Sequence, residues 1–286
     1  LLNILFTFSE LLLKKKSLPL MLLNARITKK SYSKWKMFPS TSNMLFKKFD
    51  ICLSQNQETK KYLKYLGAKK IKFFGNLKFS ESKSQKNNNF DDKSKKIFKS
   101  RKIWCAASTH NTEEKICALA HKKLKNKYNN LVTIIIPRHI QRTDYIINEI
   151  KDLNLKVQTR STSNKISKNT DIYLVDAYGE TKSFYKICKT VFLGGSLINH
   201  GGQNPLEPAR FGCKILHGPY VQNFTEVYNL LEKNNLSSKF NNIDQLINLI
   251  NQSFIKKTNF ANKINKLKKI GLNILEKTLS EINCYL

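Results

Sequence analysis

The sequence predicts an α/β fold with parallel sheets, arranged as two domains. Short apolar runs alternate with longer amphipathic stretches, which is the pattern of strands and helices in such sheets. The chain has 286 residues, enough for two domains of roughly 100–200 residues each. Hydrophobic residues make up 41% of it, which allows a sizeable core and argues against a disordered chain.

The first part of the chain, residues 1–82, contains the elements of an incomplete domain. Residues 1–13 form an apolar run that ends at three lysines. This run is shorter than the ~20 residues that cross a bilayer, so we interpret it as an amphipathic helix of a domain that begins before Leu1. One helix is expected to end at about residue 38, and a second is expected over 57–66, with Gly67 at its end. Strands are expected at residues 18–23, 51–54 and 70–74.

A polar stretch, residues 83–100, separates this part from the rest. It is rich in Lys, Ser and Asn and can bury little apolar surface. We therefore expect it to be a linker.

The remaining residues, 101–286, alternate more regularly between strand and helix patterns. Asn111 and Glu114 have the spacing of a capping box, which predicts a helix through residue 128. Further helices are expected near 145–153 and over 243–285. The strands are expected at residues 103–107, 131–136, 156–158, 171–175 and 190–193.

The charge of the chain predicts an anionic partner. Lys and Arg together number 51 and Asp and Glu 20, a net charge of +31. Nucleic acid, a phospholipid surface and a phosphorylated substrate are all compatible with this excess. Only six of the basic residues are Arg, the residue that reads bases by bidentate contacts, so sequence-specific nucleic-acid binding is disfavoured.

The six cysteines are widely spaced, and no two of them form a CxxC pair. This spacing indicates neither a metal site nor a disulfide framework. We expect reduced thiols, mostly buried, in a cytosolic compartment.

Glycines cluster after one predicted strand, in a loop that could bind a ligand. Six of the ten glycines lie between residues 194 and 218, directly after the strand at 190–193. Asn204 is a suitable N-cap, Pro205 suits the first helical position, and Glu207 falls in the first turn. Amide groups at such a loop and helix start attract phosphate, and the carboxylate can accept hydrogen bonds from a ribose. The alternative is an ordinary strand–loop–helix turn.

Three other loops follow strands, at the edge where open α/β sheets bind ligands. They are residues 108–110, residues 137–139 and residues 176–180. Arg138 and Arg142 could hold a phosphate through their guanidinium forks. His110 and His139 could equally be loop histidines that form hydrogen bonds with neighbouring backbone groups.

Together these loops resemble the 3-deoxy-D-manno-octulosonic acid (Kdo) transferases of lipopolysaccharide synthesis. The resemblance runs from about Pro19 to the C-terminus. Its most specific string is Gly201-Gly-Gln-Asn-Pro-Leu-Glu-Pro208, although Gln203 stands where the family commonly has His. The other matching strings are Asn24-Ala-Arg26, Gly75-Asn-Leu-Lys-Phe79, Ala106-Ala-Ser-Thr-His110, Pro137-Arg-His139, Gly179-Glu180, Gly194-Gly-Ser196, Gly218-Pro219 and Asn223-Phe224.

The resemblance implies a GT-B glycosyltransferase that moves Kdo from CMP-Kdo to the lipid A precursor, without a cofactor or a metal. It assigns residues 1–82 to the acceptor domain and residues 101–286, with their C-terminal helices, to the CMP-Kdo binding domain. The implied donor-site residues are Pro137, Arg138, Tyr178, Gly179, Glu180, Asn204, Pro205, Leu206 and Glu207, and secondary candidates are Lys78, Ser108, Gly195 and Ser196.

The family's general-base Glu is expected upstream of Leu1, because Glu10 does not align with it; this chain alone would then be inactive. The resemblance also implies a peripheral enzyme at the cytoplasmic face of the bacterial inner membrane, or one anchored by an upstream segment. The alternatives are another GT-B enzyme such as a UDP-sugar transferase, a non-catalytic remnant, and a basic nucleic-acid-binding protein.

Overall fold

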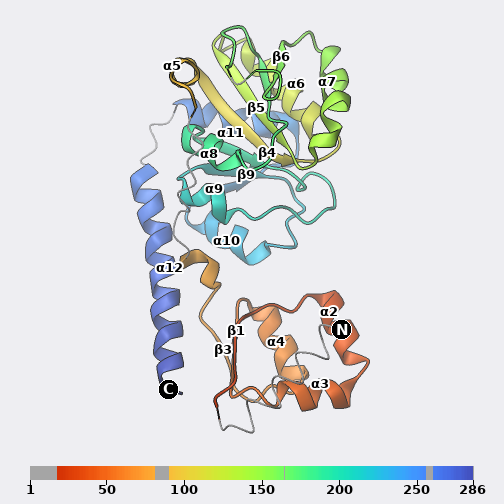
Figure 1. The fold of residues 1–286 in the computed structure, drawn as a ribbon, viewed down its shortest axis with the longest axis vertical. Coiled ribbons are helices and arrows are strands. Elements are labelled where there is room, and N and C mark those ends of the chain that lie inside the picture. The colour runs from red at the N-terminus through yellow and green to blue at the C-terminus, as the bar shows by residue number, and fades with distance from the viewer. Residues whose placement is uncertain (1–17, 81–89, 164, 256–259, 286) are drawn as a thin grey trace. The chain divides into compact units, whose positions relative to one another are not determined.

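The computed structural model describes residues 18–80, 90–163, 165–255 and 260–285 (Figure 1). The chain forms two compact units: unit 1 is Leu1–Ser82 with Lys266–Leu286, and unit 2 is Lys83–Asn265. The helix expected at residues 1–13 lies outside the described residues. Within the described ranges, no helix has both the length and the apolar composition that a membrane span requires.

Unit 1 is built on a three-stranded parallel sheet in the order β1-β2-β3. Its strands are β1 (Met21–Ala25), β2 (Ile51–Ser54) and β3 (Ile71–Phe73), and its first helices are α2 (Lys29–Lys36), α3 (Pro39–Phe46) and α4 (Gln57–Tyr65). The Asn56 side chain caps α4 by accepting a hydrogen bond from Thr59 N at 2.7 Å. Leu45, Phe46 and Leu63 lie in its core. These elements confirm the strands and helices expected here.

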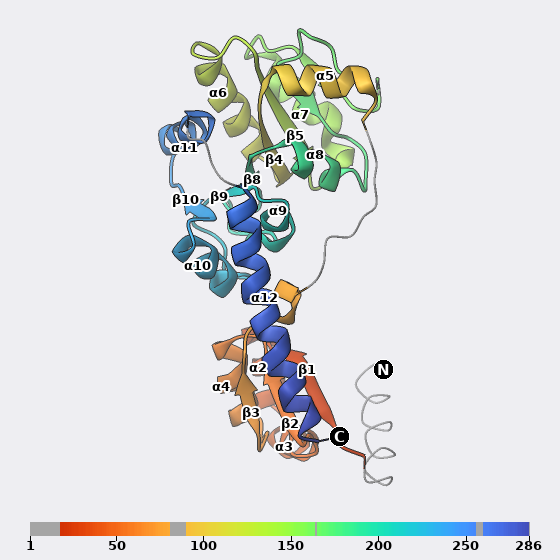
Figure 2. The ribbon, with the colours of Figure 1, turned by 90° about the vertical axis from the view of Figure 1, so that its left-hand side faces the viewer.

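The C-terminal helix α12 (Phe260–Asn283) belongs to unit 1 from Lys266 onward (Figure 2). Leu267 and Ile274 are buried, and a Cβ added at Gly271 would lie 2.3 Å from the carbonyl oxygen of Phe79, in the short helix η1 (Leu77–Ser80). The prediction had placed these residues with the nucleotide-binding domain. The lysine-rich polar face of α12 identifies it as an amphipathic helix. The sequence alone does not show which of the two sheets its apolar face covers.

Unit 2 contains a seven-stranded sheet, parallel throughout, in the order β10-β9-β8-β4-β5-β7-β6. The strands are β4 (Lys102–Thr109), β5 (Leu131–Pro137), β6 (Val157–Thr159), β7 (Ile172–Leu174), β8 (Thr190–Leu193), β9 (Lys214–His217) and β10 (Ser237–Lys239). Trp104, Ile135 and Phe192 are among the fully buried side chains of its core. All five strands expected after residue 100 are confirmed.

The strand order reverses at β4. From β4 the chain builds outward through β5 on one side and, later, through β8 on the other. The loops after these strands therefore leave the sheet in different directions, and this is the switch point where open α/β sheets bind ligands. The helices of unit 2 are α5 (Asp92–Ser100), α6 (Glu113–Lys125), α7 (Thr143–Lys151), α8 (Thr181–Ile187), α9 (Leu206–Arg210), α10 (Thr225–Lys233) and α11 (Ile243–Ile255), with the short η2 (Ile140–Arg142).

The expectation of a linker over residues 83–100 is wrong in its second half. Residues 92–100, expected in the linker, form α5, which Asp91 caps and whose Ile97 and Phe98 are buried. Phe98 packs edge-to-face against Phe90 at 5.2 Å between ring centroids, so a few apolar residues fix a segment whose average composition is polar. The helical pattern expected over 243–285 is confirmed, as two helices, α11 and α12.

Candidate functional site

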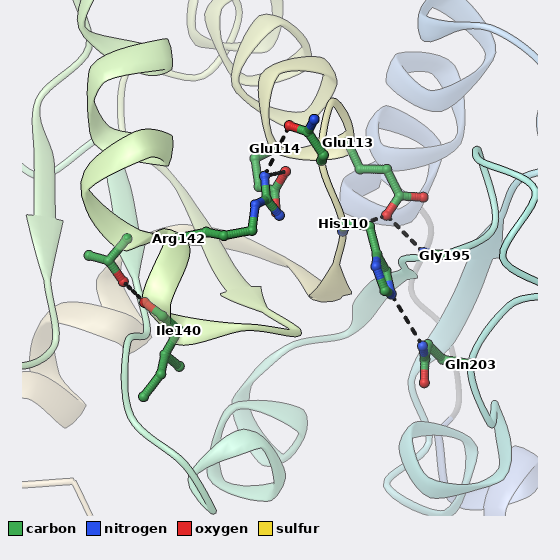
Figure 3. Close-up of polar contacts among 9 residues, drawn as sticks. His110, Glu113, Glu114, Ile140, Arg142, Gly195 and Gln203 are labelled. Carbon is green, nitrogen blue, oxygen red and sulfur yellow. Dashed lines mark hydrogen bonds and ion pairs between the residues drawn. The ribbon is translucent and has the colours of Figure 1, made fainter.

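The carboxyl edge of the unit 2 sheet brings the loops after β4, β5 and β8 together. Glu113 lies at their centre, at the start of α6, with 0% of its surface exposed. Its Oε2 accepts hydrogen bonds from His110 N at 2.9 Å and Gly195 N at 2.8 Å (Figure 3). Its Oε1 accepts from Ser196 N at 3.1 Å and Leu197 N at 3.0 Å. Burial raises the pKa of this carboxyl, and the four amides act in the opposite direction.

This arrangement corrects the expectation for the glycine-rich loop. The amides of Gly195 and Ser196, proposed from the sequence to attract phosphate, donate to Glu113 instead. The Ser196 side chain is also fully buried, where its Oγ accepts from Gly218 N at 2.9 Å. Gly195 and Ser196 therefore hold the loop in place and are not exposed to a ligand.

The loops after β4 and β8 also touch directly. A Cβ at Gly194 would lie 2.3 Å from the carbonyl oxygen of Ser108, which itself has a left-handed φ of 55°. Only glycine permits so close a backbone approach. Ser108, a secondary candidate, thus contributes to the framework of the site through its backbone.

Glu114, which is buried, and Arg142, which is partly buried, form an ion pair. Arg142 donates from Nη1 to Glu114 Oε1 at 2.9 Å and from Nη2 to Oε2 at 3.2 Å (Figure 3). The capping box expected between Asn111 and Glu114 is therefore wrong: α6 starts at Glu113, after Thr112 with a φ of 76°. Arg142 links the loop after β5 to α6. Its guanidinium is therefore engaged in an internal ion pair.

Arg138 differs from Arg142 in being exposed. It follows the buried Pro137 at the end of β5, and its backbone N donates to Thr109 O at 2.9 Å. Among the residues that the structure describes, no hydrogen bond or ion pair engages its guanidinium. Arg138 is therefore a cation at the switch point that is available to an anionic ligand.

The loop after β7 carries the next three expected residues. Tyr178 is 67% exposed, and its hydroxyl accepts from Gln141 Nε2 at 3.4 Å. Gly179 has a φ of 83°, and a Cβ there would meet nothing within 4 Å. Glu180 accepts from Arg160 Nε at 2.8 Å, so its carboxylate already has a cationic partner.

The helix expected to begin at Pro205 begins one residue later, at Leu206, and is short. Asn204 Oδ1 accepts from Leu206 N at 3.1 Å, but Pro205 is the N-cap and α9 has five residues. So short a helix has a small dipole, which weakens the expected attraction for phosphate. Leu206 is buried, whereas Glu207 is partly exposed and lies 3.4 Å from Lys182 Nζ.

Histidines gather beside these loops. The His110 ring is 4.3 Å from the His200 ring and 5.9 Å from the His139 ring, measured between centroids. Gln203 Nε2 lies 3.5 Å from His110 Nε2 (Figure 3). Throughout the described ranges, the structure contains no group of three or more His, Cys, Asp or Glu side chains placed to hold a metal ion.

Comparisons with known proteins agree with this architecture. The family described as 3-deoxy-D-manno-octulosonic-acid transferase (kdotransferase) matches residues 10–81. A 3-deoxy-D-manno-octulosonic acid transferase from Haemophilus influenzae is 31% identical over 219 residues, 76% of this chain and 51% of that protein. The crystal structure of the C-terminal CMP-Kdo binding domain of WaaA from Acinetobacter baumannii is 28% identical, with a TM-score of 0.57, and covers 60% of this chain and 90% of that one.

The chain is similar to Kdo transferases along most of its length. It spans about half the length of the curated relatives that it matches. A glycosyltransferase from Rickettsia africae shares the fold at 15% identity and a TM-score of 0.52, covering 98% of this chain and 80% of that one. The predicted α/β class of GT-B type is confirmed.

The expected donor residues at the ends of β5, β7 and β8 all lie in unit 2, and their contacts with a ligand stay predictions. Lys78 lies in η1 of unit 1. Sequence reasoning missed Glu113 and His200. Glu113 could be mistaken for an ordinary acidic residue in a first helical turn, because its contacts reach residues more than eighty positions away.

Proposed function

We propose that this chain is part of a glycosyltransferase that moves Kdo from CMP-Kdo to the lipid A precursor. The observation that carries the proposal is the match to the CMP-Kdo binding domain of WaaA, of which the chain covers 90%. It supports a donor nucleotide bound at the carboxyl edge of the unit 2 sheet, where the predicted residues lie.

In the proposed reaction, an acceptor hydroxyl gives its proton to a general base and attacks the anomeric carbon of Kdo, and CMP departs with the bonding electrons. The bond between sugar and phosphate is already activated in the donor, so the proposed chemistry uses no cofactor. Negative charge develops on the departing phosphate, and Arg138 can stabilise it as an exposed cation at the switch point. Glu207, which is only partly buried, is the proposed partner of the ribose hydroxyls.

We propose an anionic lipid surface as a further partner, at the cytoplasmic face of the bacterial inner membrane. In unit 1, Met37 is 74% exposed and Phe38 is 62% exposed, at the junction of α2 and α3. Exposed lysines of α2 adjoin them: Lys29, Lys30, Lys34 and Lys36. Apolar side chains beside lysines suit peripheral binding to acidic phospholipid headgroups. The scarcity of Arg favours this partner over nucleic acid.

Calorimetric titration with CMP tests the donor site. Arg138→Ala should weaken CMP binding by about 10- to 100-fold, the usual effect of losing a charged hydrogen bond worth roughly 1.5–3 kcal/mol. Lys115→Ala is the matched control, because Lys115 is an exposed cation on α6 of the same unit. Equal CMP affinity of the Arg138→Ala variant and the parent would remove Arg138 from the site, and tighter binding of UDP than of CMP would favour a UDP-sugar enzyme.

Transfer itself is tested with the protein that carries this chain, a CMP-Kdo generating system and lipid A precursor. Radiolabelled Kdo should appear in the lipid product. A protein that binds CMP but labels no lipid under these conditions would contradict the proposed acceptor.

A further inference from the structure

Three histidines from separate segments meet at the switch point of unit 2. His110 follows β4, His139 follows β5 and His200 lies in the loop after β8; we refer to them as the histidine cluster. Their ring centroids are 4.3 Å apart for His110 and His200 and 5.9 Å apart for His110 and His139. Gln203 adds an amide whose Nε2 is 3.5 Å from His110 Nε2 (Figure 3). Four groups able to donate hydrogen bonds thus lie together.

The cluster is held in a defined geometry. His110 N and Gly195 N both donate to Glu113 Oε2, so one buried carboxylate fixes the loop of His110 and the loop that leads to His200. Gly195 has a φ of 65°, and a Cβ there would lie 3.2 Å from His200 Cδ2 and 3.3 Å from His110 Cδ2. The backbone of the glycine-rich loop therefore packs against both rings.

The surroundings of the cluster are positive. Burial lowers the pKa of His110 to about 4, and it acts together with the charges of His200, His139, Arg138 and Arg142. The two carboxylates at the start of α6 are already committed, Glu113 to four amides and Glu114 to Arg142. An anion placed beside the rings would be attracted by this environment, and the imidazole and amide N–H groups could donate to it.

We propose that the histidine cluster and Gln203 form the subsite for the carboxylate of the donor sugar. This inference rests on the proposed function. Kdo is an ulosonic acid, so its carboxyl group is attached to the anomeric carbon, next to the phosphate in the nucleotide-linked form. A donor of this kind brings two neighbouring anionic groups. Arg138 takes the phosphate, and the histidine cluster takes the carboxylate.

The assignment explains why nitrogen donors rather than a second arginine gather here. A carboxylate accepts up to about four hydrogen bonds, and the imidazoles and the amide of Gln203 provide several donors from different directions.

The test compares two ligands by calorimetry: CMP, and a phosphonate-linked analogue of CMP-Kdo, which keeps the carboxylate and resists hydrolysis. The His139→Ala/His200→Ala variant is suitable because both side chains are exposed and their loss should not unfold the protein. We expect it to bind the analogue about 10- to 100-fold more weakly than the parent, as for lost hydrogen bonds to a charged group, and to bind CMP within about twofold of the parent. Asn199→Ala, next to His200 and also exposed, is the control and should leave both affinities unchanged.

Two results would overturn the inference while leaving the proposed function intact. One is a parent protein that binds CMP and the analogue equally well. The other is a double variant that loses affinity for CMP as much as for the analogue, which would assign the histidine cluster to the phosphate. A parent protein that binds neither ligand would instead contradict the proposed function, and the inference with it.

Discussion

Replacing Glu113 by Gln tests whether one buried carboxylate organises the site. The change keeps the shape of the side chain but turns one acceptor oxygen into an NH₂ group. In either orientation of the amide, two of the four backbone N–H groups then face a donor. Either the pair from His110 and Gly195 or the pair from Ser196 and Leu197 loses its acceptor.

The size of the effect follows from these contacts. Each buried donor left without a partner costs about 1–3 kcal/mol, so two cost roughly 2–6 kcal/mol. Removing a buried charge offsets part of this, since burial raises the pKa of Glu113. We expect Glu113→Gln to lower the free energy of unfolding of unit 2 by about 2–4 kcal/mol.

Urea unfolding followed by tryptophan fluorescence measures this. The chain has two tryptophans, Trp35 in unit 1 and the fully buried Trp104 in β4 of unit 2. A Trp35→Phe background therefore lets Trp104 report on unit 2 alone. Glu232→Gln is the control, because the amide can still hydrogen-bond with His217 Nε2, now 3.0 Å from Glu232 Oε1, as acceptor or as donor. A loss below about 0.5 kcal/mol for Glu113→Gln, the range of ordinary surface substitutions, would refute the reasoning.

Three further predictions concern charge and exposure. The pKa of His110 falls from 6.5 to about 4 on folding, so between these pH values the unfolded chain binds more protons than the folded one. The free energy of unfolding should therefore fall as the pH is lowered from 6.5 to about 4. Urea unfolding at several pH values should show a flatter pH dependence for His110→Gln, and an unchanged slope would contradict the prediction. Arg142→Gln leaves the buried carboxylate of Glu114 without its cation and should cost about 3–5 kcal/mol in the same assay. Adding Glu114→Gln to this variant should restore part of the loss. A cost under about 1 kcal/mol for Arg142→Gln would show that the pair contributes no more than an exposed one. In flotation with acidic liposomes, the variant Met37→Ser/Phe38→Ser should bind about tenfold more weakly than the parent at high salt. It should keep the salt-sensitive part of the binding, because the lysines supply that part. Unaltered binding at high salt would place the lipid contact elsewhere.

Several strands could be predicted from the sequence because they are short apolar runs buried on both faces, as are β2, β5, β7 and β8. Residues 131–136, for example, match β5 closely, and every residue of that strand is buried. The positions of Arg138 and Glu180 after their strands also follow from this pattern. The regular alternation of strands and helices was sufficient to fix the fold class.

The partners of the polar groups could not be predicted in the same way. Glycine-rich loops that bind phosphate and glycine-rich loops that bind an internal carboxylate look alike, and only the fold shows that Gly195 donates to Glu113. Arg138 and Arg142 are four residues apart, yet one is exposed and the other is paired with Glu114. These differences depend on α6, which approaches from a distant part of the sequence.

The helix α12 has a consequence for how the protein is made. Unit 1 takes its first strands from the beginning of the chain and its last helix from the end, with the whole of unit 2 encoded between them. On the ribosome, the surface that Leu267, Gly271 and Ile274 cover, including the backbone of Phe79, stays open until α12 has been made. Unit 2 has all its strands once Lys239 has been made, before α12, and can fold first, as domains commonly do during synthesis. Unit 1 is thus begun before unit 2 but closed after it, and until then the backbone of Phe79 stays open to chaperones.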